Sequence, residues 1–249
     1  MTVAGDRLVS RARVLDAAAC AAVAARVHAL RAHWVARDDC AFHTLGAALY
    51  LDRPTDETRA RFDLPAAEPA RYAALAERLN PLLSTHFGAL HRLLADALAD
   101  LLGAAVRFAP ARALPGFHIF ESHPRYARQA AHVPHFDRQY ECIEWPDGAA
   151  IDFSTAISVT LPLRLPARGG GLRVWDLNLH EVQALGPQAA RERARVAPAR
   201  LHRYAVGELV CHRGHLLHQI QPWPARAGEQ RLTLQAHGLW FDGAWQLYW

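Results

Sequence analysis

Two side chains suited to metal binding stand two residues apart, at His135 and Asp137 in the segment HVPHFD. Residues i and i+2 of a β-strand point to the same side, so both side chains are expected to project together toward one metal ion. An imidazole combined with a carboxylate suits Fe(II), Zn or Mn. Because the chain contains 15 His residues, the alternative for this pair is a surface strand with a His–Asp hydrogen bond.

A second segment, residues 207–222, offers three histidines as a further ligand: His212, His215 and His218. His218 lies in an apolar, strand-like run that leads to Pro222. His212 and His215 flank Gly214, so we predict that both lie on a turn. For each histidine taken alone, the alternative is a solvated position in a loop.

A third segment, residues 228–238, alternates cleanly between polar and apolar side chains. Leu232, Leu234 and Ala236 share one face of the predicted strand, and the polar residues share the other: Arg231, Thr233, Gln235 and His237. An Arg and a Thr two residues apart can bind one carboxylate jointly, through the guanidinium fork and the hydroxyl. The alternative is a polar face exposed to solvent.

The composition excludes several kinds of chemistry. The 249 residues include no Lys, so all 28 basic residues are Arg, and Schiff-base, pyridoxal phosphate and P-loop lysine chemistry is impossible. No GxSxG motif is present for a serine hydrolase. The Arg residues are interleaved with 24 acidic residues, and the formal net charge is +4, so we expect no nucleic-acid partner.

The cysteines and the apolar runs point to a cytoplasmic protein. The four cysteines form no CxxC pair and are expected to be reduced thiols: Cys20, Cys40, Cys142 and Cys211. Residues 1–10 contain no apolar core of signal-peptide length. The Ala-rich run 17–25 is followed directly by charged residues, so we expect no membrane span.

The order of elements predicts a mixed α+β fold in one domain over residues 1–249. Helical spacing marks 17–34, with Asp16 as the N-cap, and then 70–79 and 82–102, ending at Gly103, so about 10–104 is expected to be a helical N-terminal part. From about 105 to 249, short apolar runs separated by Gly and Pro predict an antiparallel barrel or sandwich. Its strands are expected at 106–108, 117–120, 153–165, 172–177, 201–206, 208–211, 216–221 and 231–239, with a polar, Arg-rich insertion at 186–199.

Taken together, the three segments resemble the 2-oxoglutarate/Fe(II) dioxygenases, and within them the prolyl-hydroxylase-like branch. The features that carry the resemblance are the HxD motif, His218 81 residues after Asp137, and Arg231 13 residues later. Further similar stretches lie between about 114 and 238: Pro115-Gly116, Gly169-Gly170-Gly171-Leu172, Gly207-Glu-Leu, Pro222 and Gly228-Glu-Gln. The resemblance implies a double-stranded β-helix (a jelly-roll, cupin-like core) buttressed by the N-terminal helices.

The resemblance also implies site residues. His135, Asp137 and His218 would hold Fe(II), which leaves three positions for 2-oxoglutarate and O2. Arg231 would bind the distal carboxylate of 2-oxoglutarate with help from Thr233, with Arg226 as the fallback anchor, and His118 would lie near the 1-carboxylate. A carboxylate at 137 argues for hydroxylation or a similar oxidation, because related halogenases have a small residue there. Expected contacts to a small-molecule or amino-acid-like substrate come from Arg138, Tyr140, Trp145 and Trp175. The alternative is packing for Trp175, which is favoured there, and an ordinary surface role for the other three.

Two other classes of protein stay open. One is a cupin-like metal enzyme that does not use 2-oxoglutarate and has no need for Arg231 and Thr233 on an inward face. The other is a non-enzymatic β-sandwich that binds a ligand or partner and has incidental histidines. Substrate, reaction outcome and oligomeric state are not decided by the sequence.

Overall fold

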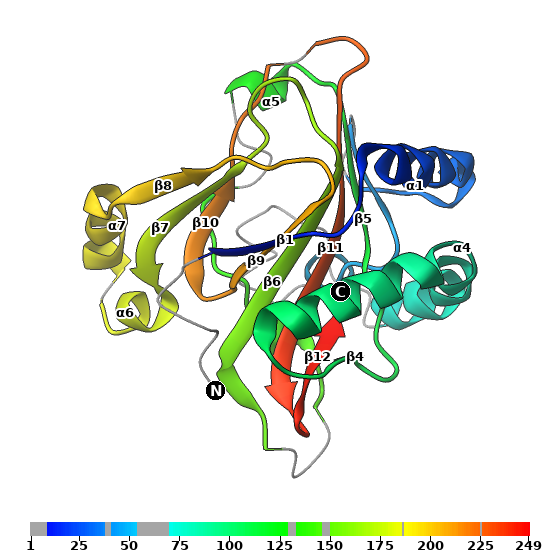
Figure 1. Cartoon of the computed structure of the whole chain (residues 1–249). Helices are drawn as coiled ribbons and strands as arrows, with labels where there is room; N and C mark the ends of the chain where they lie inside the picture. Colours follow the sequence, from blue (N-terminus) through cyan, green and yellow to red (C-terminus); the bar gives the residue numbers. More distant parts are fainter. Residues whose placement is uncertain are drawn as a thin grey trace.

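The computed structural model describes residues 9–37, 41–53, 70–128, 133–145, 150–185, 187–224 and 226–249. Figure 1 shows its helices and strands. The strands are β1 Val9–Arg13, β2 Val35–Ala36, β3 Phe42–Leu45, β4 Val106–Phe108, β5 Gly116–Glu121, β6 Asp152–Arg164, β7 Leu172–Asn178, β8 Ala199–His202, β9 Glu208–Arg213, β10 Leu216–Ile220, β11 Gln230–Phe241 and β12 Ala244–Tyr248. The helices are α1 Ala17–Ala29, η1 Arg31–His33, α2 Leu49–Asp52, α4 Arg71–Leu102, α5 Arg125–Arg128, η2 Gln139–Cys142, α6 Leu179–Gln183 and α7 Pro187–Val196.

The strands form two sheets. The large sheet has the order β1-β9-β6-β11-β5-β3-β2, with β12 paired to β11 and β4 paired to β12. The small sheet has the order β10-β7-β8, and an antiparallel bridge between His135 and His218 adds the HxD segment beside β10. From β5 to β11 the chain therefore passes repeatedly between the two sheets, which is the double-stranded β-helix, or jelly-roll, arrangement. The predicted fold class is confirmed.

The central strand β11 separates the core from the space between the sheets. It pairs with both β5 and β6, and its apolar residues Leu232, Leu234 and Ala236 are buried in the main hydrophobic core. Ile157, Val159 and Leu161 of β6 lie in the same core. Since side chains alternate along a strand, the polar residues of β6 and β11 face the other way, toward the small sheet.

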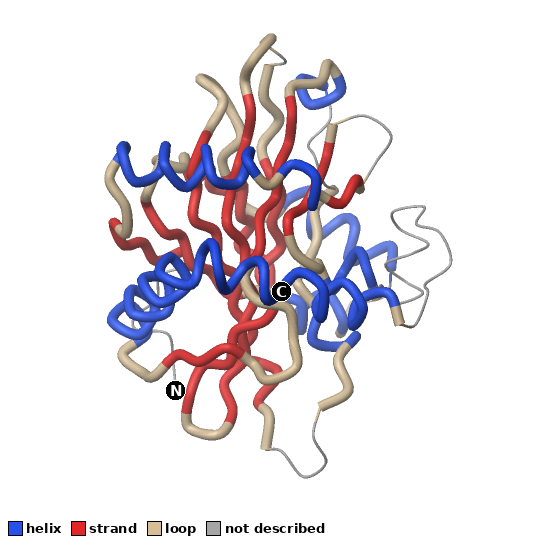
Figure 2. The backbone as a smooth tube through the Cα atoms, turned by 90° about the vertical axis from the view of Figure 1, so that its right-hand side faces the viewer, coloured by secondary structure: helices blue, strands red, loops and turns tan. Residues whose placement is uncertain are grey.

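Helices α1 and α4 cover the outer, apolar face of the large sheet. The main core contains Val27 of α1 and Leu83, Phe87 and Leu94 of α4 together with the apolar residues of the sheet. Figure 2, viewed from the side of these helices, shows them lying in front of the strands. The helices thus seal one face of the large sheet and leave the other face to the cavity.

Both predicted helix boundaries that depend on caps are confirmed. The Asp16 side chain accepts a hydrogen bond from the backbone N–H of Ala19, and α4 ends at Gly103 with a left-handed conformation (φ 65°). The two runs predicted at 70–79 and 82–102 form one continuous helix that contains Pro81. Pro81 and Glu77 are exposed, so water can solvate the Glu77 carbonyl that loses its helical hydrogen bond.

Other boundaries differ from the prediction. The part expected to be helical, about 10–104, also contains strands β1, β2 and β3, which join the large sheet. The insertion 186–199 contains the helix α7, and β8 lies at 199–202 instead of 201–206. The C-terminal aromatic residues belong to β11, the extra strand β12 and Trp249, where Trp245, Tyr248 and Trp249 are buried. One domain over 1–249 stays a prediction.

The strands at the ends of the sheets are short. β1 has five residues and β2 two, β4 has three, and β8 has four. None of the described helices is both long enough and apolar enough to cross a membrane.

Burial of a histidine in α4 predicts that the fold is less stable in acid. The His91 side chain is buried, its ring Nε2–H donates to the Pro115 carbonyl (2.9 Å), and burial lowers the pKa of His91 to about 4. Below pH 6.5 the unfolded chain binds a proton at His91 that the folded chain does not, so the free energy of unfolding should fall as pH drops toward 4. A shift of this size corresponds to about 3 kcal/mol.

Urea unfolding at pH 7 and pH 4.5 tests this expectation. His91→Gln should lose less stability on acidification than the wild type, because Gln does not titrate. His33→Gln, at an exposed position in η1, should behave like the wild type. An identical pH dependence in wild type and His91→Gln would contradict the assignment.

Candidate metal centre and its cavity

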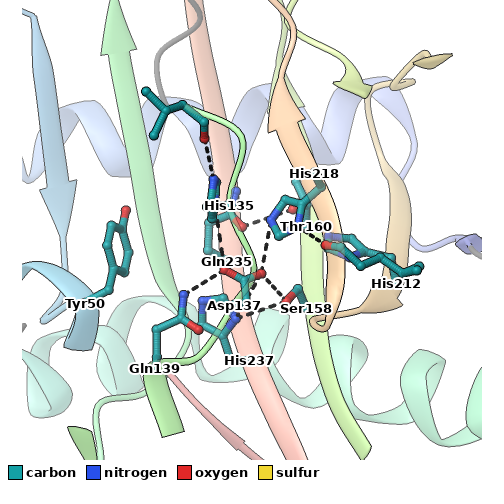
Figure 3. Close-up of polar contacts among 12 residues, drawn as sticks. Tyr50, His135, Asp137, Gln139, Ser158, Thr160, His212, His218, Gln235 and His237 are labelled. Carbon is teal, nitrogen blue, oxygen red and sulfur yellow. Dashed lines mark hydrogen bonds and ion pairs between the residues drawn. The ribbon is translucent and has the colours of Figure 1, made fainter. Parts of the chain in front are cut away.

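Three metal-ligating side chains meet between the two sheets. His135 and His218 face each other across the antiparallel bridge, in which the backbone N–H of each donates to the carbonyl of the other at 2.9 and 3.0 Å. Asp137 follows two residues after His135, and its backbone N–H donates to the Gly214 carbonyl in the β9–β10 turn (2.8 Å). One ligand atom from each of the three side chains lies within 4.8 Å of the others (Figure 3).

The two imidazoles are held with the same nitrogen facing the carboxylate. Nδ1–H of His135 donates to the Val133 carbonyl (2.7 Å), and Nδ1–H of His218 donates to the Leu216 carbonyl (2.8 Å). Each Nε2 therefore faces Asp137, at 3.7 and 3.2 Å from its oxygens, and its lone pair is the one that a metal would take in place of a proton. Fixing the tautomer through the second ring nitrogen is what protein metal sites require of histidine ligands.

The Asp137 carboxylate is buried and held from both sides. Gln139 Nε2 donates to Oδ1 (2.8 Å), and the Ser158 hydroxyl donates to Oδ2. Burial alone would raise the pKa of Asp137, but the facing imidazoles, His218 first, lower it well below its usual value when they carry a proton. The carboxylate is thus ionised and oriented as a ligand.

The triad opens into a cavity of about 380 Å³. Its wall contains the side chains of both sheets and of the segments around α6 and η2. The lining residues are Tyr50, His118, His135, Phe136, Asp137, Arg138, Gln139, Glu141, Cys142, Ser158, Thr160, Leu172, Leu179, Val182, Gln183, Tyr204, His212, His218, Ile220, Arg231, Gln235 and His237.

Arg231 is a buried cation in this wall. It is 1% exposed and lies between the rings of Phe120 and Tyr204, 5.7 and 5.6 Å from their centroids. Its Nε donates to the Gly170 carbonyl (3.1 Å), which turns the two terminal nitrogens away from that contact. Among the residues that the structure describes, no carboxylate pairs with Arg231, and burial lowers the pKa of its guanidinium. A buried cation of this kind is stabilised by an anionic ligand.

The other expected co-substrate residues surround Arg231 in different ways. Thr233 is fully buried and does not line the cavity; its hydroxyl accepts from Gln235 Nε2 (2.8 Å) and lies 3.5 Å from Arg231 Nη1. His118 lines the cavity, and its Nε2 contacts the Tyr50 hydroxyl at 2.8 Å. Arg226, the fallback anchor, is exposed and is not part of the wall.

Two tyrosines of the wall were not found from the sequence. Tyr50 comes from the short helix α2, which a buried ion pair between Asp52 and Arg37 (2.5 Å) holds in place. Tyr204 precedes β9 and lies against Arg231. Burial raises the pKa of both hydroxyls, so both stay protonated. Neither residue belongs to an alternating strand pattern, so no periodicity marks it.

His212 corrects a prediction. It lies on β9, not on a turn, and is buried, with its ring centroid 4.6 Å from that of His218. Ser158 of β6 pairs with His212 on one side and with His237 of β11 on the other, so these three side chains form a row across three strands. His215 does lie in the turn, buried, with Nε2 2.8 Å from the Tyr140 hydroxyl.

Of the four expected substrate contacts, only Arg138 lines the cavity, where it pairs with Glu141 at 2.8 Å. Tyr140 is buried outside the cavity beside Phe153, and Trp145 packs against Phe241 and Tyr248. Trp175 packs on the outer side of β7 in the apolar cluster of Leu177, Ala197 and Leu217. The alternation of β7 explains this, because Leu172 faces the cavity and a residue three positions later faces away.

Comparison with known proteins gives structural similarities only. No family model and no curated protein matches the chain. An N-substituted L-amino acid dioxygenase from Burkholderia ambifaria is 18% identical with a TM-score of 0.48, covering 93% of this chain and 91% of its own. The non-haem α-ketoglutarate-dependent epimerase SnoN from nogalamycin biosynthesis is 16% identical with a TM-score of 0.49, covering 92% and 76%.

A prolyl-4-hydroxylase from Pseudomonas putida is 18% identical with a TM-score of 0.40, covering 95% of this chain and 92% of its own. All three TM-scores are below 0.5, so these similarities carry no weight for function. What this chain does must be inferred from the side chains of its own cavity.

The hydrogen bond from Ser158 to Asp137 predicts an effect on metal affinity. Ser158→Ala should weaken divalent-metal binding about 10- to 100-fold, because the carboxylate loses one of the two donors that orient it. Ser154→Ala, on the same strand but bonded to Asp152 at the surface, should bind metal like the wild type. Isothermal titration with Co(II) measures both; equal affinities for the two variants would show that Ser158 does not support the ligand.

Proposed function

We propose that this protein is a mononuclear non-haem Fe(II) oxygenase that uses 2-oxoglutarate and O2, and that it belongs to the double-stranded β-helix 2-oxoglutarate dioxygenases. The observation that carries the proposal is the combination, in one cavity, of a His–Asp–His triad and a buried guanidinium without a carboxylate partner among the described residues.

The donor set fits Fe(II). Two neutral imidazoles and one carboxylate on one side of an ion leave its other positions open, which is the ligand arrangement of non-haem iron oxygenases. Nε2 of His218 and the nearer oxygen of Asp137 are 3.2 Å apart. Two ligands each about 2.1 Å from a metal and at right angles are about 3 Å apart, so little movement is needed.

The surroundings of Arg231 fit the distal carboxylate of 2-oxoglutarate. Its Nε is occupied by Gly170, so Nη1 and Nη2 are the groups available for a bidentate contact with a carboxylate. Arg231, His118 and the triad line the same cavity, as a ligand that spans from guanidinium to metal requires. The Tyr50 and Tyr204 hydroxyls would add neutral donors beside it.

When bound, Fe(II) and 2-oxoglutarate supply oxidative decarboxylation of the co-substrate to succinate and CO2, coupled to activation of O2. The residues of the chain position these groups: the backbone carbonyls behind His135 and His218 fix the imidazoles, and Gln139 and Ser158 fix the carboxylate. Burial of Asp137 and His218 limits the access of bulk water to the reacting groups.

The reaction we propose is hydroxylation of an unactivated C–H of a small molecule. The Asp137 carboxylate would occupy the metal position that a small residue leaves open to a halide in the related halogenases. A cavity of about 380 Å³ is of the size that small-molecule sites have.

The iron and the co-substrate can be tested together by anaerobic ultraviolet–visible titration. Adding Fe(II) and then 2-oxoglutarate to the apoprotein should give a weak metal-to-ligand charge-transfer band in the visible. The band should be absent in His218→Ala, which lacks one ligand, and unchanged in His33→Ala, an exposed position. Iron binding without the band would point to a metal enzyme that does not use 2-oxoglutarate.

Arg231 and Arg226 provide a test variant and its control for the co-substrate site. Arg231→Ala should raise the KM for 2-oxoglutarate at least tenfold, since loss of a buried charge pair costs about 2–5 kcal/mol, while iron affinity changes little. Arg226→Ala, at an exposed position in the loop before β11, should keep the wild-type KM. Succinate release at varied 2-oxoglutarate measures both. An unchanged KM in Arg231→Ala would remove the proposed anchor.

A further inference from the structure

The cavity has two chemically different halves. Around Arg231 the wall offers the hydrogen-bond donors of the guanidinium, beside the rings of Tyr50 and Tyr204. At the end of the polar face of β11 remote from Arg231 lies His237, in a row with Ser158 and His212, and the amide of Gln139 lines the same cavity. The protons of this second half follow from its hydrogen bonds and its burial.

The assignment for His237 follows from Ser158. The Ser158 hydroxyl has one proton, and it donates that proton to Asp137, which can only accept. The contact between Ser158 Oγ and His237 Nδ1 (3.3 Å) is therefore donated by Nδ1–H of His237. The His237 ring is buried, and burial disfavours the charged form of an imidazole, so the ring is neutral and its Nε2 is a lone-pair acceptor.

His212 and Gln139 are assigned in the same way. Nδ1 of His212 lies 3.0 Å from the Arg213 carbonyl, which only accepts, so Nδ1 carries a proton; the ring is buried, which disfavours a second proton, and Nε2 is then an acceptor. Gln139 must direct its NH2 group at the Asp137 carboxylate, so its Oε1 is the free end of the amide.

The three residues that carry these acceptor atoms line the cavity. His212, His237 and Gln139 are 5%, 8% and 9% exposed and all line the wall. Within the described part of the chain, His212 Nε2, His237 Nε2 and Gln139 Oε1 have no hydrogen-bond partner, yet none is among the polar atoms sealed from solvent. The nearby cation, Arg138, is ion-paired with Glu141.

We infer that this half of the cavity binds a part of the substrate that carries O–H or N–H donors, a hydroxyl or an amine, held by His237, His212 and Gln139 next to the metal. The inference rests on the proposed function and adds the substrate class. A carboxylate or phosphate would meet acceptors and Asp137 there, so an anionic group is excluded from this half and is bound only near Arg231.

The test is ¹⁵N NMR of the imidazoles in protein loaded with Zn(II), a diamagnetic ion for the same ligands, and 2-oxoglutarate. His212 and His237 should both show protonated Nδ1 and unprotonated Nε2. Glycerol and ethanolamine, as small donor probes, should shift both Nε2 resonances, because these atoms accept hydrogen bonds from them. Acetate and propionate should not shift them.

Three variants complete the test. His237→Phe should weaken binding of the donor probes about tenfold, the cost of one hydrogen bond. His237→Gln, which offers an amide oxygen, should recover most of that affinity, and His33→Phe, at an exposed position, should match the wild type.

Three outcomes would overturn the inference. They are a proton on either Nε2, tighter binding of the carboxylates, and no shift with either donor probe at any concentration that the protein tolerates. The tautomers and the probe shifts can also be measured without 2-oxoglutarate. A failure to bind 2-oxoglutarate would count against the proposed function. It is therefore distinguished from a result in which His212, His237 and Gln139 do not accept hydrogen bonds.

Discussion

The register of β11 is the constraint on which the core and the cavity both depend. Leu232, Leu234 and Ala236 pack against the helices, while Arg231, Gln235 and His237 line the cavity. A slip of one residue would place the polar set in the core and the apolar set beside the metal ligands. Pairing of β11 with both β5 and β6 prevents such a slip. The register that buries the apolar residues is therefore also the register that places the polar residues in the cavity.

The proposed metal ligands depend on the same assembly, although they lie on the other sheet. His135 and His218 are fixed by the bridge that adds the HxD segment to β10, and Asp137 is bonded to the turn between β9 and β10. The side chain of Asp137 then reaches across to Ser158 on the large sheet. The Asp137 carboxylate therefore connects the two sheets, and its position depends on how the sheets are stacked.

The sequence predicted what alternation and spacing encode. The alternation of residues on β11, the Asp16 cap and the Gly103 end could all be predicted, because each depends on neighbours within one element. The structure also brings His135, Asp137 and His218 together, as the motif spacing indicated. Residues such as Tyr50 and Tyr204 were missed, since they reach the cavity through packing of segments distant in sequence. His212 was misplaced because the glycine two residues later suggested a turn that begins at His212, whereas β9 continues to Arg213 and the turn begins at Gly214.

The orientation of Trp175 and the N-terminal strands also could not be predicted from local sequence. Trp175 lies on a correctly predicted strand, but which face of that strand meets the cavity is set by its pairing with β10 and β8, not by its own residues. β1, β2 and β3 are short, and their strand character comes from partners 70 or more residues away for β1 and β3. Local pattern cannot supply that information.

The short outer strands have a consequence for the behaviour of the protein in concentrated solution. An exposed strand edge can pair with the edge of another chain, and short or charged edge strands reduce this risk. Here β1 carries Arg11 and Arg13, β4 carries Arg107 and β8 carries Arg200, while β2 has only two residues. Because the chain contains no Lys, Arg is the basic residue that opposes edge-to-edge pairing and aggregation at these strands.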